Sequence, residues 1–387
     1  MNCLKKCDYC SQSPGEFNLL ELFSGIGGMH LALQSSGAGN LYSPVNVTAI
    51  DINTNANCVY RYNFPDNNLL SRNITALKLD EITKKPIDLV TMSPPCQPFT
   101  RLGLKKDLDD LRSDAFNHLM TNVWPQWKQK PRMILLENVK GFETSKAHDL
   151  ALEVFTNCGY EIREFLLSPN QFGIPNTRLR YYLLAKLPNQ NNASSSFIIP
   201  KSDSIIMNVP EINLDQICFH CRDNLSINVP IEETINNEPI RIKKFLQYDP
   251  NDEQYNQLIY NQFNVPKNIV DKYLPAMDIV NMESVKSCCF TRSYGTLITG
   301  TGSLLNISPD KQSTGNQFNK TINCDLKLRY FTPREVANLM CFPDNFKFPT
   351  NLTNKQCYKL LGNSINIKVV SFLFKILLAE PIRQLNN

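Results

Sequence analysis

Cys96 is the side chain best placed in this sequence to act as a nucleophile. It lies in the stretch SPPCQPF (residues 93–99), directly after the apolar run 87–92. That run predicts a short buried strand, which the two prolines end because they remove backbone donors and fix φ. The thiol would then stand at the carboxyl end of a strand, the edge of an open α/β sheet where ligands bind. A small buried cysteine that only fills space is the alternative.

A glycine-rich turn and an aspartate form a second candidate group. The first apolar run leads into ELFSGIGGMH (residues 21–30), and the next run ends at Asp51. Glycines let a ligand approach the backbone, although this spacing is not that of dinucleotide-binding folds. A carboxylate at the end of the next strand can accept hydrogen bonds from ribose hydroxyls. An adenosine-containing ligand fits both features, whereas a structural turn and a capping aspartate are the alternatives.

An acid and two arginines complete the set. Glu137 follows the apolar run 133–136, where burial would favour the neutral carboxyl and let it donate a proton near neutral pH. Arg178 and Arg180 lead into the apolar run 181–185. On a strand, residues two apart face the same side, so both guanidinium groups could hold one anion or carboxylate. A structural acid bonded to backbone amides and a solvated strand face are the alternatives.

One reaction uses all of these groups together: methyl transfer to C5 of a cytosine. That carbon is too poor a nucleophile to take a methyl group unaided. A thiolate that adds to C6 makes the ring enamine-like, and an acid at N3 stabilises the adduct. An adenosine-linked sulfonium would supply the methyl group, and loss of the C5 proton would then release the thiol.

The elements that must position these groups predict an α/β fold. Apolar runs at 17–22, 45–50, 87–92, 133–136 and 181–185 alternate with helical stretches, as in a doubly wound parallel sheet. Near Pro188 the sequence becomes polar and of low complexity, which marks a boundary. We therefore expect an N-terminal extension (1–16), a first domain (17–187), a smaller loop-rich domain (188–325) and a C-terminal segment (326–387) that completes the first domain.

Composition permits a nucleic-acid partner without requiring one. The chain has 387 residues, 42% of them hydrophobic, with 40 Lys and Arg against 36 Asp and Glu. The N-terminus lacks the apolar core of a signal peptide, and no stretch approaches the roughly 20 apolar residues of a membrane span. We expect a cytoplasmic or nuclear protein that acts without a membrane, and its thirteen cysteines to be mostly thiols.

The motifs, in this order along the chain, resemble those of the cytosine-C5 methyltransferases. The resemblance covers 17–187 and about 326–378, through the glycine turn, the nucleophile motif, ENV at 137–139, the Gln171 to Arg180 motif and GNS at 362–364. It implies a Rossmann-like S-adenosylmethionine-dependent methyltransferase sheet, with a smaller target-recognition domain inserted before the C-terminal segment.

The resemblance also implies roles for single residues. Cys96 would be the nucleophile, Glu137 would contact and protonate N3, and Arg178 with Arg180 would orient the base and the acid. The cofactor would be S-adenosylmethionine, and no metal would be required. Its pocket would be lined by Phe23, Gly25, Ile26, Gly27, Gly28, Asp51, Ile52, Ile74, Thr75, Ser93, Asn363 and Ser364.

Finer motifs resemble the branch of this family that methylates tRNA. They are SPPCQPFTR at 93–101, CFT at 289–291, SYG at 293–295 and GTGS at 300–303. That branch acts on cytosine 38 in the anticodon loop of tRNA-Asp, where an unpaired base costs less to extrude than one in a duplex. The implied substrate contacts are Arg101, Lys105, Cys289, Phe290 and Thr291, and we expect a monomer. Further candidate phosphate contacts are Lys106, Arg112, Arg241, Lys243 and Lys244.

Two rival functions remain open at this point. DNA cytosine-C5 methylation uses identical chemistry, although the sequence lacks the large N-terminal region of a maintenance enzyme with chromatin-reading modules. A catalytically idle nucleic-acid-binding protein is the second rival. The presence of the nucleophile, the acid and both arginines argues against it.

Cysteine spacing raises two minor hypotheses. Cys3, Cys7 and Cys10 have the spacing of a radical S-adenosylmethionine iron–sulfur motif, but they stand on a polar tail instead of after a barrel strand. Cys7 and Cys10 could also form a zinc site with Cys218 and Cys221. A mobile tail with ordinary thiols is the simpler explanation.

Overall fold

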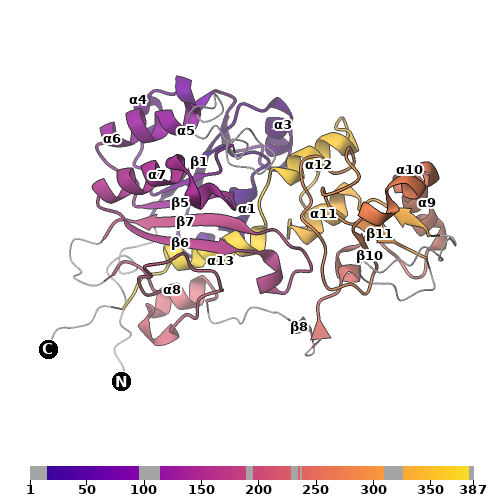
Figure 1. The fold of residues 1–387 in the computed structure, drawn as a ribbon. Coiled ribbons are helices and arrows are strands. Elements are labelled where there is room, and N and C mark those ends of the chain that lie inside the picture. The colour runs from indigo at the N-terminus through magenta and orange to yellow at the C-terminus, as the bar shows by residue number, and fades with distance from the viewer. Residues whose placement is uncertain are drawn as a thin grey trace. The chain divides into compact units, whose positions relative to one another are not determined.

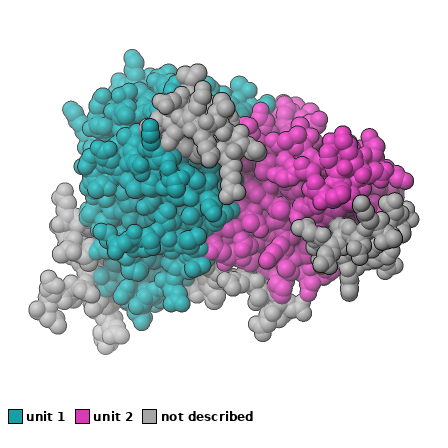
Figure 2. All heavy atoms as spheres, in the orientation of Figure 1, with its two compact units in different colours: residues 1–167, 179–230, 367–387 teal, residues 168–178, 231–366 magenta. Residues whose placement is uncertain are grey.

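The computed structural model describes residues 15–95, 114–188, 195–227, 234–235, 238–308 and 326–382 (Figure 1). The chain forms two compact units (Figure 2). Unit 1 comprises residues 1–167, 179–230 and 367–387, and unit 2 comprises residues 168–178 and 231–366. The chain thus leaves unit 1 twice and returns to it twice.

A seven-stranded sheet forms the centre of unit 1, in the order β3-β2-β1-β4-β5-β7-β6. Its strands are β1 (Phe17–Leu22), β2 (Val45–Ile50), β3 (Asn68–Leu70), β4 (Leu89–Met92), β5 (Met133–Val139), β6 (Glu161–Leu167) and β7 (Arg180–Lys186). The predicted α/β class is confirmed. The prediction that the whole sheet is parallel is wrong at β7, which runs antiparallel to β5 and β6. No α-helix joins β6 to β7, and antiparallel neighbours do not need a crossover helix.

Helices cover both faces of this sheet. Figure 1 shows α7 over one face and α13 over the other. The α-helices of unit 1 are α1 (Gly28–Ser35), α2 (Ala38–Leu41), α3 (Thr54–Asn63), α4 (Leu79–Ile82), α5 (Asp114–His118), α6 (Trp124–Gln126), α7 (Lys146–Asn157), α8 (Phe219–Asn224) and α13 (Ile367–Leu378). A π-helix η5 (Leu119–Val123) and the 3-10 helices η1 (Ile74–Ala76), η6 (Phe142–Thr144) and η8 (Leu214–Gln216) complete it. The apolar helix α13 packs against α1 and β7, which buries most of its side chains.

Unit 2 is built from small sheets and helices. Its strands are β8 (Thr234–Ile235), β9 (Glu238–Pro239), β10 (Ile279–Val280), β11 (Leu304–Asn306) and β12 (Leu328–Arg329). Its α-helices are α9 (Glu253–Phe263), α10 (Lys267–Tyr273), α11 (Pro333–Leu339) and α12 (Asn354–Gly362), and its 3-10 helices are η7 (Pro169–Phe172), η9 (Ile242–Phe245) and η10 (Leu274–Ala276). A buried bidentate pair between Arg329 and Glu335, with both N···O distances 2.7 Å, fixes β12 to α11.

The boundaries of the compact units differ from the predicted domain boundaries. Residues 188–230 belong to unit 1, because Ile206 exchanges main-chain hydrogen bonds of 2.9 Å with Glu164 and Leu166 of β6. Residues 326–366 belong to unit 2, because β12 pairs with β11. Only the last segment, 367–387, returns to unit 1. The assignment of catalysis to one unit and target recognition to the other stays a prediction.

One described stretch, Asn354–Leu378, is long and apolar enough to cross a membrane by length and composition alone. This corrects the expectation that no segment would reach that length. The stretch comprises α12 and α13, and 67% of its most apolar window is buried inside the protein. Core helices share this composition, so it is weak evidence for a span.

His148 ties α7 to the sheet through acidic partners. Its Nε2 lies 2.7 Å from Oε1 of Glu164 on β6, and its Nδ1 lies 3.2 Å from Oδ1 of Asp149. The hydroxyl of Tyr181 on β7 donates to the same Glu164 oxygen at 2.8 Å. Burial opposes protonation, but the hydrogen bond and charge of Glu164, with Asp149, outweigh it and raise the pKa of His148.

We expect the contribution of His148 to stability to shrink as the pH rises. The pKa of histidine in the unfolded chain is about 6.5, so the contribution is complete below that pH and is lost as the pH rises through the higher pKa of the folded protein. Urea unfolding of the wild type and His148→Gln over this range checks it. The gap in unfolding free energy between the two should narrow with rising pH, and a constant gap would contradict the prediction.

Candidate active site

The segment expected to carry the nucleophile begins at the carboxyl end of β4. This strand lies between β1 and β5 in the sheet. Ser93 is half-buried and Pro94 is buried, and the Asn138 amide donates to the Pro94 carbonyl at 3.4 Å. Cys96 lies outside the described residues, as do four basic candidates: Arg101, Lys105, Lys106 and Arg112. The roles of these five residues stay predictions.

Glu137 and Arg180 lie together on the neighbouring strands β5 and β7. The Arg180 Nε is 3.6 Å from Oε1 of Glu137, and both side chains are largely buried. The register of the strands sets this approach, because Arg180 stands opposite Val139, two residues beyond Glu137. The predicted pairing of an arginine with the acid is therefore present in unit 1. Such a guanidinium can orient a carboxyl group toward a reacting base.

Arg178 has different partners and belongs to unit 2. Its guanidinium donates to the main-chain carbonyls of Phe290 at 3.2 Å and Gly362 at 3.1 Å, and also to that of Ser364. Strand β7 begins at Arg180, so the alternation of side chains along a strand does not extend to Arg178. The two arginines were expected to face the same side, but they bond to different partners. Arg180 reaches the acid, and Arg178 fastens the main chain of unit 2.

The CFT motif of unit 2 is partly core. Phe290 is 2% exposed and packs edge-on against Tyr294 and Phe331. Its side chain therefore belongs to the core of unit 2, and its expected role as a substrate contact stays a prediction. The half-buried Cys289 has its Sγ 3.5 Å from Arg178. Thr291 donates its main-chain N–H to the Thr301 carbonyl at 2.8 Å.

The glycine turn and Asp51 are brought together, as predicted for an adenosine site. Oδ2 of Asp51 accepts the Gly25 N–H at 2.8 Å, and Oδ1 accepts the Asn53 N–H at 2.7 Å. Burial raises the pKa of Asp51, although these amide bonds oppose the rise. The Ile52 amide also bonds to this group, but the two oxygens together offer about four acceptor sites, so the carboxyl can also accept a hydrogen bond from a ribose hydroxyl.

The surroundings of this turn fit an adenosine-containing cofactor. The Ser24 hydroxyl is buried without a hydrogen-bond partner among the described residues. A Cβ placed on Gly25, whose φ is +55°, would meet no atom within 4 Å, so the backbone there borders open space. Ile52 is 67% exposed beside Asp51 and offers an apolar surface. An unsatisfied donor, an open backbone and an apolar wall together suit a nucleoside.

Other predicted cofactor residues have structural roles or lie elsewhere. Ile26 and Ile74 are buried, and Phe23, with φ +56°, packs partly against the core. Gly28 is buried at the start of α1, and Thr75 is exposed within η1. Asn363 and Ser364 belong to unit 2, so their grouping with the glycine turn stays a prediction.

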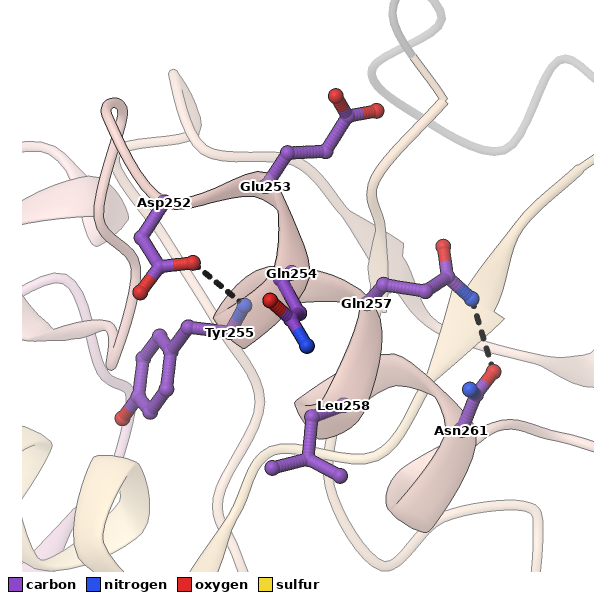
Figure 3. A pocket seen from close by; sticks show the side chains of 7 residues that line it. All are labelled: Asp252, Glu253, Gln254, Tyr255, Gln257, Leu258 and Asn261. Carbon is purple, nitrogen blue, oxygen red and sulfur yellow. Dashed lines mark hydrogen bonds between the residues drawn. The ribbon is translucent and has the colours of Figure 1, made fainter.

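Two hollows of unit 2 contain no residue of the predicted catalytic or cofactor sites. One lies on α9 and is lined by Asp252, Glu253, Gln254, Tyr255, Gln257, Leu258 and Asn261 (Figure 3). Its hydrogen bonds are a helix cap and a pair four residues apart, as on an ordinary helix surface. The other, about 1150 Å³, includes Arg241 in its lining. Arg241 and Lys243 both pair with Glu283, at 3.4 and 3.3 Å, which weakens them as phosphate contacts.

The cysteine hypotheses gain no support from the structure. Cys218 and Cys221 are buried, whereas His220 between them is half-buried. Within the described ranges no group of three or more His, Cys, Asp or Glu residues could hold a metal ion. Cys3, Cys7 and Cys10 fall outside those ranges.

Comparison with known proteins relates this arrangement to characterised families. Residues 17–379 match the family model described as C-5 cytosine-specific DNA methylase. The chain is 40% identical to the human tRNA (cytosine(38)-C(5))-methyltransferase, over 93% of this chain and 98% of that protein. It is 37% identical to a DNA (cytosine-5)-methyltransferase of Dictyostelium discoideum, over 94% of this chain and 95% of that protein.

A solved structure gives the same result at the level of the fold. The crystal structure of the Dnmt2 methyltransferase of S. pombe superposes with a TM-score of 0.73 at 38% identity. The match covers 94% of this chain and 98% of that one. The similarity therefore extends over both compact units.

Proposed function

The chain belongs to the C-5 cytosine-specific DNA methylase family, and on that premise we propose that it methylates C5 of cytosine 38 in the anticodon loop of tRNA. It is a cytosine-C5 methyltransferase. The observation that supports tRNA as the substrate is the 40% identity to the human tRNA enzyme over nearly the whole of both chains. DNA methylation is not favoured, although the D. discoideum relative keeps it as the alternative to test.

The proposed cofactor is S-adenosylmethionine, which supplies an electrophilic methyl group when bound. Asp51 would accept hydrogen bonds from its ribose, and the Gly25 backbone would lie against the nucleoside. The Ser24 hydroxyl, which is buried without a hydrogen-bond partner among the described residues, would then donate to a polar group of the ligand. Ile52 would cover an apolar face of the adenine.

The residues of the chain would act on the target base in a fixed order. The Cys96 thiolate adds to C6, and Glu137 donates a hydrogen bond or proton at N3, which places electron density on C5. Arg180 holds Glu137 in the required orientation. Once C5 carries the methyl group and has lost its proton to a base, the C6–S bond breaks, the Cys96 thiolate leaves, and any proton transferred to N3 returns to Glu137.

Methyl transfer from labelled S-adenosylmethionine to three substrates tests this function. They are tRNA-Asp, its variant with adenine in place of cytosine 38, and a cytosine-containing DNA duplex. We expect label in the unmodified tRNA only, because a single-stranded loop base is the easiest to extrude. Label in the adenine variant would refute the assigned position. Label mainly in DNA would establish the alternative, and none in any substrate would refute both.

The partner is proposed to be tRNA-Asp, bound by a monomer in the cytoplasm or nucleus. Of the implied contacts, Cys289 and Thr291 are half-buried residues of unit 2. Parallel assays with other tRNA species test the preference for tRNA-Asp. Equal rates on several tRNAs would contradict it.

A further inference from the structure

Glu21 is a carboxyl group enclosed completely within unit 1. It lies on β1, two residues before Phe23 of the glycine turn, and its exposed fraction is 0%. Its neighbours in the sheet are Ala49 of β2 and Thr91 of β4, neither of which carries a charge. A buried carboxyl group persists only where it is hydrogen-bonded, so the contacts of Glu21 decide what it does.

The contacts of Glu21 join β1 to two helices. Its Oε1 accepts the main-chain N–H of His30 on α1 at 3.3 Å, and its Oε2 accepts the hydroxyl of Tyr60 on α3 at 3.1 Å. The His30 ring continues the network, with Nδ1 3.2 Å from the Tyr60 hydroxyl and Nε2 3.1 Å from the Gln34 amide. One carboxyl group therefore links three elements of the unit.

These two helices follow the two loops of the adenosine site. Helix α1 begins directly after the glycine turn, and α3 begins three residues after Asp51. The turn also packs on the network itself, because a Cβ on Gly27 would lie 2.4 Å from the Phe64 ring and 3.2 Å from the Tyr60 ring. A shift of α1 or α3 must therefore disturb the bond between Asp51 and Gly25.

No positive charge among the described contacts compensates Glu21. The titratable groups that act on it are Tyr60 from α3, Asp51 from the end of β2 and His30 from α1. Burial raises the pKa of Glu21 to about 8, and the repulsion of Asp51 adds to the rise. Burial also lowers the pKa of His30 to about 4, so this ring is neutral near pH 7. The carboxyl of Glu21 is thus mostly protonated at neutral pH.

We propose that Glu21 is a positioning residue for the cofactor, which acts through Tyr60 and the His30 amide to hold the glycine turn and the Asp51 loop in their binding arrangement. This inference rests on the proposed S-adenosylmethionine site. It assigns Glu21 no contact with substrate or with the reacting atoms. Ionisation of the carboxyl would place an uncompensated negative charge in the core, where burial and the repulsion of Asp51 both oppose it. The arrangement that binds the cofactor should then be less stable, so cofactor affinity should fall as the pH rises through about 8.

The dissociation constant of S-adenosylhomocysteine, measured calorimetrically from about pH 6.5 to 9, tests the inference. We expect the wild type to weaken about tenfold between pH 7 and 9, one unit of log affinity per unit of pH beyond the pKa. Glu21→Gln cannot ionise, and its amide oxygen can still accept the His30 N–H while its NH2 group donates to the Tyr60 hydroxyl. It should therefore bind within about threefold of the wild type at pH 7 and lose the part of the pH dependence that Glu21 causes. Glu21→Ala should bind at least about tenfold more weakly at pH 7.

Controls separate this effect from other causes. Glu153→Gln makes the same change on the exposed face of α7 and should retain the wild-type profile. Asp51 also has a raised pKa, so the comparison with Glu21→Gln isolates the share of Glu21. Circular dichroism checks that each variant is folded, and Glu21→Gln keeps the test decisive if Glu21→Ala does not fold.

Each outcome bears on the inference. A Glu21→Gln profile identical to that of the wild type overturns it, as does a folded Glu21→Ala protein with wild-type affinity. A wild type that does not bind S-adenosylhomocysteine at any pH overturns the proposed cofactor and this inference with it. A wild type that binds while the Glu21 variants match it overturns only the role of Glu21.

Discussion

Replacing Cys96 by alanine is expected to lower the rate of methyl transfer at least about ten-thousandfold, while tRNA binding stays nearly unchanged. Without the thiolate, C6 receives no nucleophile and C5 keeps its low reactivity. The tRNA contacts do not depend on that bond, so affinity should be conserved. Single-turnover transfer from labelled S-adenosylmethionine and a filter-binding titration with tRNA measure the two quantities separately.

Cys158→Ala is the matched control for this substitution. Cys158 is half-buried at the end of α7, and burial raises the pKa of its thiol, which makes it a poor nucleophile. This variant should turn over like the wild type. Retained turnover in Cys96→Ala would refute the assignment of the nucleophile, and a parallel loss in both variants would point to general damage by thiol removal.

Replacing Gly362 by alanine should destabilise unit 2 by at least about 3 kcal/mol. A Cβ at this position would lie 2.1 Å from the main-chain N of Arg292 and 2.2 Å from the carbonyl carbon of Thr291. Both obstacles are backbone, so no flexible side chain can move aside. The carbonyl of Gly362 also accepts a hydrogen bond from Arg178, which ties the GNS motif to the CFT motif. Equilibrium denaturation of the full chain measures the loss.

Gly39→Ala provides the contrasting variant. A Cβ on Gly39, within α2, would meet no atom within 4 Å. Alanine is also the better helix former, so the free energy of unfolding should change by less than about 1 kcal/mol. Similar losses in the two variants would show that close approach at Gly362 is not the cause.

The apolar runs predicted part of the sheet accurately. β1 and β2 have the predicted bounds. Both lie in the parallel part of the sheet, where β1 is buried throughout and β2 is buried at Val47, Ala49 and Ile50. β6 was missed because its sequence, EIREFLL, carries three charged residues. One of them, Arg163, is buried against the Pro200 and Ile199 carbonyls and the Phe197 ring. Those partners come from a segment more than thirty residues away, and local pattern does not encode them.

The candidate site, too, could be predicted from the sequence only in part. The sequence correctly predicted that Asp51 lies beside the glycine turn and Glu137 beside Arg180. The first pair comes from the ends of the neighbouring strands β1 and β2, and the second from the neighbouring strands β5 and β7. The sequence did not predict that Arg178 and Arg180 have different partners. The chain passes from unit 2 to unit 1 between them, and nothing in the local sequence marks that boundary. Nor did the sequence single out Glu21, whose importance depends on Tyr60, a residue that the sequence shows only as one aromatic position within a helix.

The packing of α13 against α1 has a consequence for biosynthesis. Helix α1 leaves the ribosome long before its apolar partner α13, because residues 36–366 lie between the two helices. The whole of unit 2 is translated in between. A nascent chain can therefore complete unit 2 before unit 1 has closed its core, and the apolar surface of α1 must wait until α13 has been translated to be covered. An interrupted message that ends within unit 2 would yield a protein with that surface exposed, a substrate for chaperones and proteases.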